Sequence, residues 1–199
     1  MAFVSNEKRL VFIHIPKNAG TSICKHLSMA HGLDLTGKRD FKHNGVGNNI
    51  PPQFRPNGIN VHDTLEEVHA KYPVCQSYVS FAVVRNPWAR LYSFYLHKLR
   101  LGDKDLPPHG SFAEVFQKSN VLLLQPQFYW CRGADRVLRY EHLDDDYQRL
   151  SLDFDLKGDL PHLNRSQSDE SYRDHYDDYS RKLIGEFYRY EIEQLGYQF

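Results

Sequence analysis

A lysine, a glycine and two hydroxyl residues lie close together near the N-terminus, and their types suit the binding of an anion. Lys17 carries a positive charge, and Thr21 and Ser22 can donate hydrogen bonds from their hydroxyl groups. Gly20 allows the chain to turn tightly between them. Residues 16–22 are therefore predicted to form a loop that binds phosphate or sulfate.

A strand and a helix are predicted on the two sides of this loop. Residues 11–15 are β-branched or aromatic apart from His14, and Pro16 ends the strand because it cannot donate to a sheet. Beyond the loop, apolar residues recur at helical spacing: Ile23, Leu27 and Ala30. The two hydroxyl residues then lie on the first helical turn, where unpaired N–H groups and the helix dipole favour an anion.

The loop differs from the nucleotide triphosphate P-loop, which places its lysine directly before the Ser/Thr. The stretch from His14 to Ser22 instead resembles the 5′-phosphosulfate loop of sulfotransferases that use 3′-phosphoadenosine 5′-phosphosulfate (PAPS). The sequence of this stretch is most similar to that of the carbohydrate (Golgi-type) branch of the family. The resemblance implies a donor-binding role for Lys17, Asn18, Ala19, Gly20, Thr21 and Ser22. An ordinary turn with a helix cap is the structural alternative.

A second corner between a strand and a helix follows residues 77–84, which are apolar toward their end as in a central parallel strand. Asn86 is a favourable N-cap and Pro87 a favourable first helical residue. Arg85 is thus left at the carboxyl end of the strand, where open α/β sheets bind ligands. Ser93, about two turns into the helix, can reach a phosphate that this arginine holds.

Arg85 and Ser93 resemble the 3′-phosphate motif of PAPS-dependent sulfotransferases, in which Arg-x-Pro is followed by a serine. Two anion-binding corners after two strands fit a ligand with phosphates at both ends of one ribose. The resemblance therefore implies PAPS as the sulfuryl donor and adenosine 3′,5′-bisphosphate (PAP) as the product. An ion-paired arginine and a serine on a packed helix are the alternative.

His62 is the candidate general base. Asp63 and Glu66 form a capping-box-like signature for a helix that runs to about Tyr72, so His62 lies just outside a helix N-terminus. The positive end of a helix disfavours a protonated histidine and leaves a neutral base. The branch that the chain resembles carries its base at this place, before a short helix between the two motifs. A surface or capping histidine is the alternative.

Three further regions are candidates for contacts with substrate. Residues 37–58 combine Gly, Asn and Pro without periodicity, which predicts a long loop, either a lid or a surface excursion. Residues 125–131 are aromatic and either line an acceptor groove or pack in the core. The resemblance places a loop with Arg165 and Ser166 over the nucleoside or the 3′-phosphate, with a plain loop surface as the alternative.

The whole pattern predicts one α/β domain over residues 1–199, with a central, mostly parallel sheet flanked by helices. A third strand is expected over residues 136–140, and further helices over 111–118, from 143, and over 178–195. The expected apolar stripes include Trp88, Tyr92, Tyr95 and Leu99; Leu143, Tyr147 and Leu150; and Leu183, Phe187 and Tyr190, with Ile184 and Tyr188 beside the last three. The resemblance makes this a P-loop-like sulfotransferase fold.

The composition narrows the class of protein. Lysine plus arginine equal aspartate plus glutamate at 25 each, so no net field recruits nucleic acid or an anionic membrane. The three cysteines are an odd number without a CxxC pair, which favours reduced thiols and a cytoplasmic location. Residues 1–9 are polar and no apolar run reaches membrane-spanning length, so no export signal or membrane span is expected. Related animal enzymes are Golgi-anchored, so the resemblance implies a stripped catalytic domain.

The resemblance implies a PAPS-dependent sulfotransferase that moves a sulfuryl group in line to an acceptor hydroxyl, with a carbohydrate as the expected acceptor. Lys17 and His62 are the expected catalytic residues, the first for charge on the leaving phosphate and the second for the hydroxyl proton. No metal-binding motif is present and none is required. Two alternatives stay open: a P-loop-type nucleotide kinase or hydrolase, and a nucleotide-binding module without catalysis.

Overall fold

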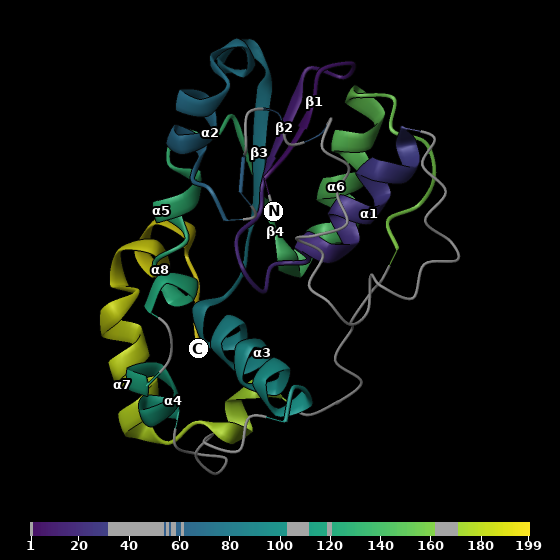
Figure 1. Ribbon diagram of the computed structural model, residues 1–199. Coiled ribbons are helices and arrows are strands. Elements are labelled where there is room, and N and C mark those ends of the chain that lie inside the picture. The colour runs from purple at the N-terminus through teal and green to yellow at the C-terminus, as the bar shows by residue number, and fades with distance from the viewer. Residues whose placement is uncertain are drawn as a thin grey trace. The chain divides into compact units, whose positions relative to one another are not determined.

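The structure is a computed structural model that describes residues 2–31, 54, 56, 59–60, 62–102, 112–118, 121–161 and 171–199 (Figure 1). These residues group into two compact units. The sheet unit comprises Met1–Val84 and Phe128–Asn164, and the helical unit comprises Arg85–Gln127 and Arg165–Phe199. The single domain over residues 1–199 stays a prediction.

The sheet unit is built on four described strands, β1 (Phe3–Ser5), β2 (Leu10–Ile13), β3 (Val79–Val84) and β4 (Arg136–Arg139), which lie in this order. β1 pairs antiparallel with β2, whereas the β2–β3 and β3–β4 pairs are parallel. Parallel pairing brings the carboxyl ends of β2 and β3 to the same edge of the sheet. The predicted α/β class, with a mostly parallel sheet flanked by helices, is confirmed.

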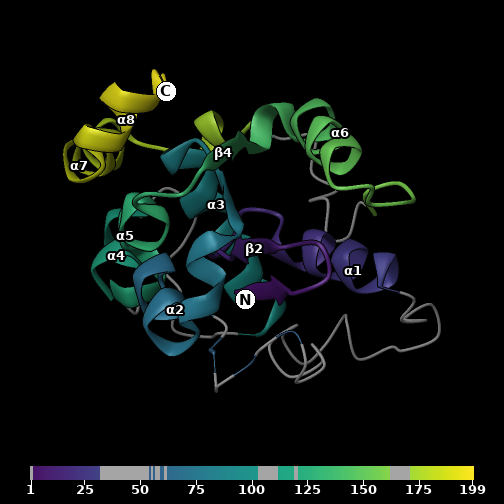
Figure 2. The same cartoon turned by 90° about the horizontal axis from the view of Figure 1, so that it is seen from above.

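Helices cover both faces of this sheet. α1 (Gly20–Ala30) and α6 (Leu143–Asp153) lie on one side, and α2 (Leu65–Lys71) and α5 (Phe128–Cys131) lie on the other (Figures 1 and 2). The described part of the unit also contains 3₁₀ turns at Pro73–Ser77 and Tyr140–His142. The stripes predicted for α1 and α6 are confirmed, because one buried cluster contains Ile23, Leu27, Leu143, Tyr147 and Leu150. Burial of these side chains holds both helices on the sheet.

β1 is an element that the sequence pattern does not predict. Three residues are too few to show a strand period. Phe3 is 1% exposed and lies opposite Phe12 of β2 in the register of the pair. The segment over residues 1–9 is therefore not only a polar terminus, because Phe3–Ser5 form a strand that pairs with β2.

The helical unit contains α3 (Pro87–Arg100), α4 (Phe112–Lys118), α7 (Asp178–Phe187) and α8 (Arg189–Leu195), with 3₁₀ turns at Val121–Leu124 and Tyr172–His175. Its buried cluster is rich in aromatic residues, among them Trp88, Tyr92, Tyr95, Phe112 and Tyr188. Leu99, the fourth residue of the predicted stripe on α3, is 40% exposed. That part of the prediction is wrong because the last turn of α3 is exposed.

The single helix predicted over residues 178–195 is also wrong. It breaks at Tyr188 into α7 and α8, and two residues of the predicted buried stripe, Phe187 and Tyr190, are exposed. The buried positions are Ile184 and Tyr188, which are expected beside that stripe, together with Ser180 and Glu191. Two of these are polar and do not count in a hydrophobic pattern. They are buried because each accepts a hydrogen bond, Ser180 from the N–H of Ala113 and Glu191 from that of Gln127.

Candidate functional site

The loop after β2 holds two residues in a backbone conformation that glycine normally adopts. Lys17 has a φ of 71° and Ala19 a φ of 60°. The left-handed conformation costs a residue with a side chain about 1–2 kcal/mol. Such strain is concentrated at functional sites, where the surrounding structure holds it in place. The backbone of the predicted anion-binding loop is therefore strained at Lys17 and Ala19.

Asn18 anchors this loop to the sheet. Its side chain is fully buried, and its Nδ2 donates to the carbonyl oxygen of Val83 at 2.8 Å. Val83 is the second-last residue of β3, so the bond fixes the loop at the carboxyl edge that β2 and β3 share. The side chain of Asn18 therefore positions the loop, and Arg85 follows two residues after Val83 in the chain.

α1 begins without a side-chain cap. Its N-cap residue is Ala19, which has no side-chain acceptor, and its first turn contains no acidic residue. By contrast, Thr64 caps α2 and Asn86 caps α3 through side-chain oxygens. Thr21 and Ser22 lie on the first turn of α1, as predicted. A phosphate or sulfate group at this end of α1 would meet the positive end of the helix dipole and the hydroxyl donors.

Gly20 is required by space and not by a positive φ, since it lies inside α1 and has none. A Cβ added at Gly20 would lie 1.8 Å from Cδ2 and 2.0 Å from Nε2 of His14. No real Cβ approaches another heavy atom so closely, so the imidazole ring of His14 fills the place of a side chain at the start of α1. The sequence pattern gives His14 no role, and only the three-dimensional contact identifies one.

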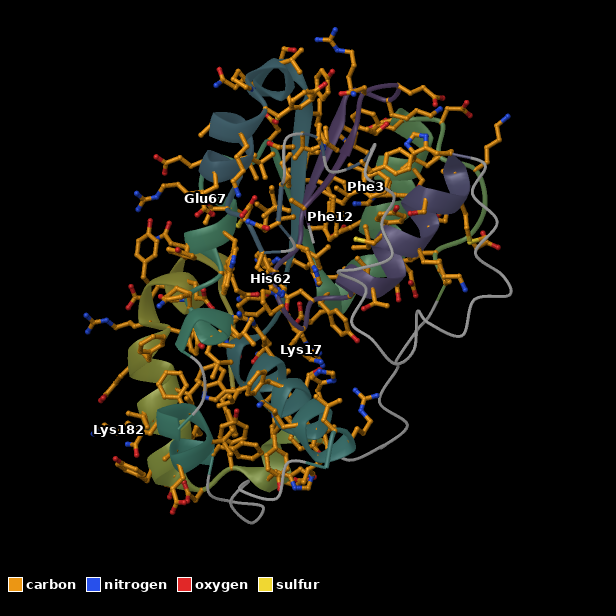
Figure 3. The ribbon with its side chains drawn as sticks, viewed as in Figure 1. Phe3, Phe12, Lys17, His62, Glu67 and Lys182 are labelled. Carbon is orange, nitrogen blue, oxygen red and sulfur yellow. The ribbon has the colours of Figure 1, made fainter. Side chains whose placement is uncertain are left out.

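His62 lies next to His14. Its Nδ1 is 3.4 Å from the backbone oxygen of His14, and the two imidazole rings are 5.2 Å apart between centroids. A carbonyl oxygen can only accept, so this long contact is a hydrogen bond when Nδ1 carries the proton. Figure 3 shows His62 and Lys17 near the end of the sheet at which β2 and β3 finish. The structure thus brings both predicted catalytic residues to one edge of the sheet unit.

The helix start beside His62 lies one residue later than predicted. Thr64 and Glu67 form the capping box of α2, each side chain bonding to the backbone N–H of the other. The predicted pair of Asp63 and Glu66 is wrong because the Asp63 carboxylate has other partners, the N–H of Asn60 at 2.7 Å and Nζ of Lys71 at 2.6 Å. His62 therefore lies two residues before the N-cap of α2.

Arg85 begins the helical unit, in the loop directly before α3. The Asn86 side chain accepts from the N–H groups of Trp88 and Ala89, and Pro87 is the first helical residue, as predicted. Ser93 lies on α3 and is half-buried. Gln127 bonds to both the N–H and the carbonyl oxygen of Arg85. No local pattern predicts this role of Gln127, because residues 125–131 stand out in the sequence only as an aromatic segment.

Two predicted regions lie outside the described residues: Arg165 with Ser166, and the loop over residues 37–58 apart from residues 54 and 56. In the described part of the chain, no three His, Cys, Asp or Glu side chains come together as metal ligands. Among the helices that are described, none combines the length and the apolar character needed to cross a membrane.

The three cysteines, Cys24, Cys75 and Cys131, are free and buried. Burial raises the pKa of the Cys24 thiol to about 11, so this thiol stays protonated near neutral pH. Although Cys24 lies only two residues after Ser22, it is therefore not a nucleophile. Its side chain instead packs in the core between α1 and the sheet.

Comparison with known proteins identifies the family. The family model described as the sulfotransferase family matches residues 1–121, more than half of the 199 residues. Among solved structures, the chain is similar to a sulfotransferase from Alicyclobacillus acidocaldarius, with 15% identity, a TM-score of 0.48, and coverage of 94% of this chain and 93% of that chain. No curated protein matches the chain. Because the family model covers most of the sheet unit and both predicted phosphate motifs, the chain belongs to the sulfotransferase family.

Proposed function

We propose that the protein transfers a sulfuryl group from PAPS to a hydroxyl group of a carbohydrate and releases PAP. The observation that carries the proposal is the Lys17 loop, in which a strained backbone leads into a helix that has no side-chain cap. This set of donors fits a phosphosulfate group, since it combines a cation, hydroxyl groups and the positive end of a helix. PAPS, when bound, supplies an activated sulfuryl group attached to a phosphate leaving group.

Lys17 acts on the charge that grows on the phosphate oxygens as the sulfuryl group departs. Its ammonium group, the N–H groups at the start of α1 and the hydroxyl groups of Thr21 and Ser22 stabilise that charge. Because this charge is larger in the transition state than in the bound donor, Lys17 contributes more to the rate than to binding. Asn18 contributes by holding the loop on Val83.

His62 takes the proton from the acceptor hydroxyl group. When Nδ1–H donates to the backbone oxygen of His14, the lone pair of the imidazole is on Nε2. We therefore assign Nε2 as the atom that accepts the proton. In this tautomer the contact with His14 helps to orient the imidazole ring, so the main chain next to the Lys17 loop places the base.

Arg85 and Ser93 bind the 3′-phosphate of the donor and hold it in register, and Arg165 and Ser166 add contacts to the nucleoside or the same phosphate. The support for Arg85 and Ser93 is the sequence motif, the Asn86 cap that starts α3 behind them, and the buried side chain that holds the Arg85 backbone. A contact remote from the reacting atoms aligns the donor, which is how binding energy away from the chemistry raises the rate.

The acceptor class and the location are further parts of the proposal. A carbohydrate is proposed because residues 14–22 are similar to the loop of the carbohydrate branch. A cytoplasmic location is proposed because all three cysteines are free, as is usual where the cell keeps thiols reduced.

A transfer assay tests the function. The full chain is incubated with PAPS labelled in the sulfuryl group and with sugars, phenols and lipid alcohols in parallel, and labelled products are separated and counted. We expect label on a sugar, with a loss of about 10²–10⁴-fold in turnover for His62→Ala. His142→Ala is the matched control, since His142 is exposed and lies in the same unit.

Three possible outcomes would each contradict a different part of the proposal. Binding of PAPS without transfer to any acceptor would show a nucleotide-binding module. Transfer that is unchanged in His62→Ala would keep the sulfotransferase activity and remove His62 as the base. Transfer to phenols alone would overturn the carbohydrate acceptor.

A further inference from the structure

The backbone of Arg85 is held on both sides by one buried side chain. The N–H of Arg85 donates to Oε1 of Gln127 at 2.8 Å, and Nε2 of Gln127 donates to the carbonyl oxygen of Arg85 at 2.9 Å. Gln127 is fully buried, and the bonds join residues 42 apart in the sequence. The amide therefore pairs with the peptide groups of Arg85 as a neighbouring strand would.

Glu191 of α8 holds Gln127 in turn. Its Oε2 accepts from the N–H of Gln127 at 2.5 Å, and its Oε1 accepts from Nε2 of Gln127 at 2.8 Å. Glu191 is 1% exposed. The two hydrogens on Nε2 are therefore used by two different acceptors, while Oε1 of Gln127 accepts from Arg85.

These partners allow only one orientation of the Gln127 amide. A flipped amide would place its oxygen against the oxygens of Arg85 and Glu191, and its NH₂ group against the N–H of Arg85. Three mismatched contacts in a buried place would each leave a polar group unsatisfied. The network therefore fixes the peptide groups of Arg85 through contacts that point one way only.

A buried cation supports the same segment. Arg90 of α3 is 1% exposed and donates to the carbonyl oxygens of Leu123 and Gln125, just before Gln127. Burial raises the pKa of the Glu191 carboxyl group. The charge of Arg90 and the hydrogen bonds from Gln127 lower this pKa, but by less than burial raises it. Burying two charged groups is unfavourable unless they are paired and hydrogen-bonded. Arg90 therefore holds the main chain that leads into Gln127.

We propose that Gln127 and Glu191 are positioning residues that fix Arg85 for the 3′-phosphate of the donor. The inference rests on the proposed function, in which Arg85 binds that phosphate. Neither residue is assigned a contact with the ligand; both act through the backbone of Arg85. Their loss should therefore weaken recognition of the 3′-phosphate and leave recognition of the rest of the nucleotide intact.

The test compares two nucleotides that differ by this phosphate. Dissociation constants for PAP and for adenosine 5′-monophosphate are measured by calorimetry on the full chain. The constant for the monophosphate divided by that for PAP reports the 3′-phosphate contribution. Gln127→Met keeps the size of the side chain and removes its hydrogen bonds. We expect it to reduce the ratio by about tenfold or more, as the loss of one hydrogen bond to a charged group would do, with affinity for the monophosphate little changed.

Two further variants sharpen the result. Gln125→Met makes the same change two residues earlier, where only the main-chain oxygen is bonded to Arg90, and should leave the ratio unchanged. Glu191→Gln replaces one acceptor of Gln127 by a donor and should reduce the ratio in the same direction. If Gln127→Met fails to fold, the Glu191→Gln variant tests the positioning role in its place. A double variant of Gln127→Met and Arg85→Ala should lose no more than Arg85→Ala alone.

The inference is overturned if a folded Gln127→Met or Glu191→Gln variant keeps the wild-type ratio, or if it loses affinity for both nucleotides equally. Failure of the proposed function looks different. In that case the wild-type protein itself binds PAP no more tightly than the monophosphate, before any residue is changed.

Discussion

The two regions proposed to bind the donor are held in place by different means. The Lys17 loop of the sheet unit is strained at Lys17 and Ala19, and the contacts that hold it include the ring of His14 beside Gly20 and a hydrogen bond from Asn18 to Val83. Arg85 of the helical unit is held by buried polar side chains from distant parts of the sequence. Both regions are tied to residues distant in the sequence, but the first depends on the packing of single residues and the second on a buried network of polar side chains.

The two regions should therefore tolerate different substitutions. The Lys17 loop depends on the size of single residues, because its strained backbone and its close contacts leave little room for a larger side chain. A buried polar network depends on every partner, since removal of one leaves the others unsatisfied. We expect steric substitutions to damage the Lys17 loop most, and loss of hydrogen bonds to damage the surroundings of Arg85 most.

Within this comparison of the two regions, replacing Lys17 or Arg85 should have the greatest effect, and the two replacements should affect different quantities. Lys17→Ala should reduce turnover by about 10²–10³-fold, as the loss of one group that stabilises developing charge does, with donor affinity much less affected. Arg85→Ala should do the reverse, since its contact is remote from the reacting atoms. Turnover and dissociation constants for PAP give the comparison, with Lys25→Ala on α1 as the control. Equal losses in both quantities for both variants would remove the division of roles.

A steric change should break the Lys17 loop without removing any charge. Gly20→Ala places a Cβ against the ring of His14 and should lower the free energy of unfolding by about 1–3 kcal/mol, as overpacking does. Turnover should fall as well, because the ring and the start of α1 must move apart. Denaturant unfolding measures the stability. The matched change Ala19→Gly relieves a left-handed residue and should leave stability unchanged or higher.

The hydrogen bond from Asn18 to Val83 should stabilise the Lys17 loop as a buried hydrogen bond does. Asn18→Ala leaves the oxygen of Val83 without this donor and should lower the free energy of unfolding by about 1–3 kcal/mol. Asn6→Ala serves as the control, since Asn6 is exposed and bonds only to the exposed Tyr78 hydroxyl in the described contacts. Similar small losses in the two variants would show that Asn18 does not anchor the loop.

The smallest expected effect is a difference in pH dependence between the units. Hydrogen bonds from Ser80 lower the pKa of Asp135 in the sheet unit below its ordinary 3.8, whereas burial raises the pKa of Glu191 in the helical unit above its ordinary 4.5. The stability from Asp135 is present above pH 3.8 and is lost as the pH falls through the lowered pKa. The contribution of Glu191 has the opposite sign, because it is present below pH 4.5 and is lost as the pH rises through the raised pKa.

Unfolding free energies measured from pH 2 to pH 7 on single variants test these signs. Asp135→Asn should flatten the acid side of the profile, and Glu191→Gln should remove the decline above pH 4.5. Profiles that change in the same direction for both variants would contradict the assigned causes.

Local signals in the sequence predict the corners of the fold well. Asn86 and Pro87 mark the start of α3, and the β-branched run before Pro16 marks β2, because caps, prolines and strand patterns act over a few residues. On α7 and α8 the sequence names Ile184 and Tyr188 but not Ser180 and Glu191, since these two are buried against partners far away in the sequence. The same reason hides Gln127, whose role depends on a contact with Arg85 that no local pattern contains.

One binding measurement tests the central claim, that residues 16–22 and Arg85 with Ser93 bind a doubly phosphorylated adenosine. Calorimetry on the wild-type chain compares PAP with ATP in the presence of Mg²⁺. We predict tighter binding of PAP, which Arg85→Ala weakens toward the affinity for adenosine 5′-monophosphate. Tighter binding of ATP with Mg²⁺, unaffected by Arg85→Ala, would contradict the account and favour a nucleotide kinase or hydrolase.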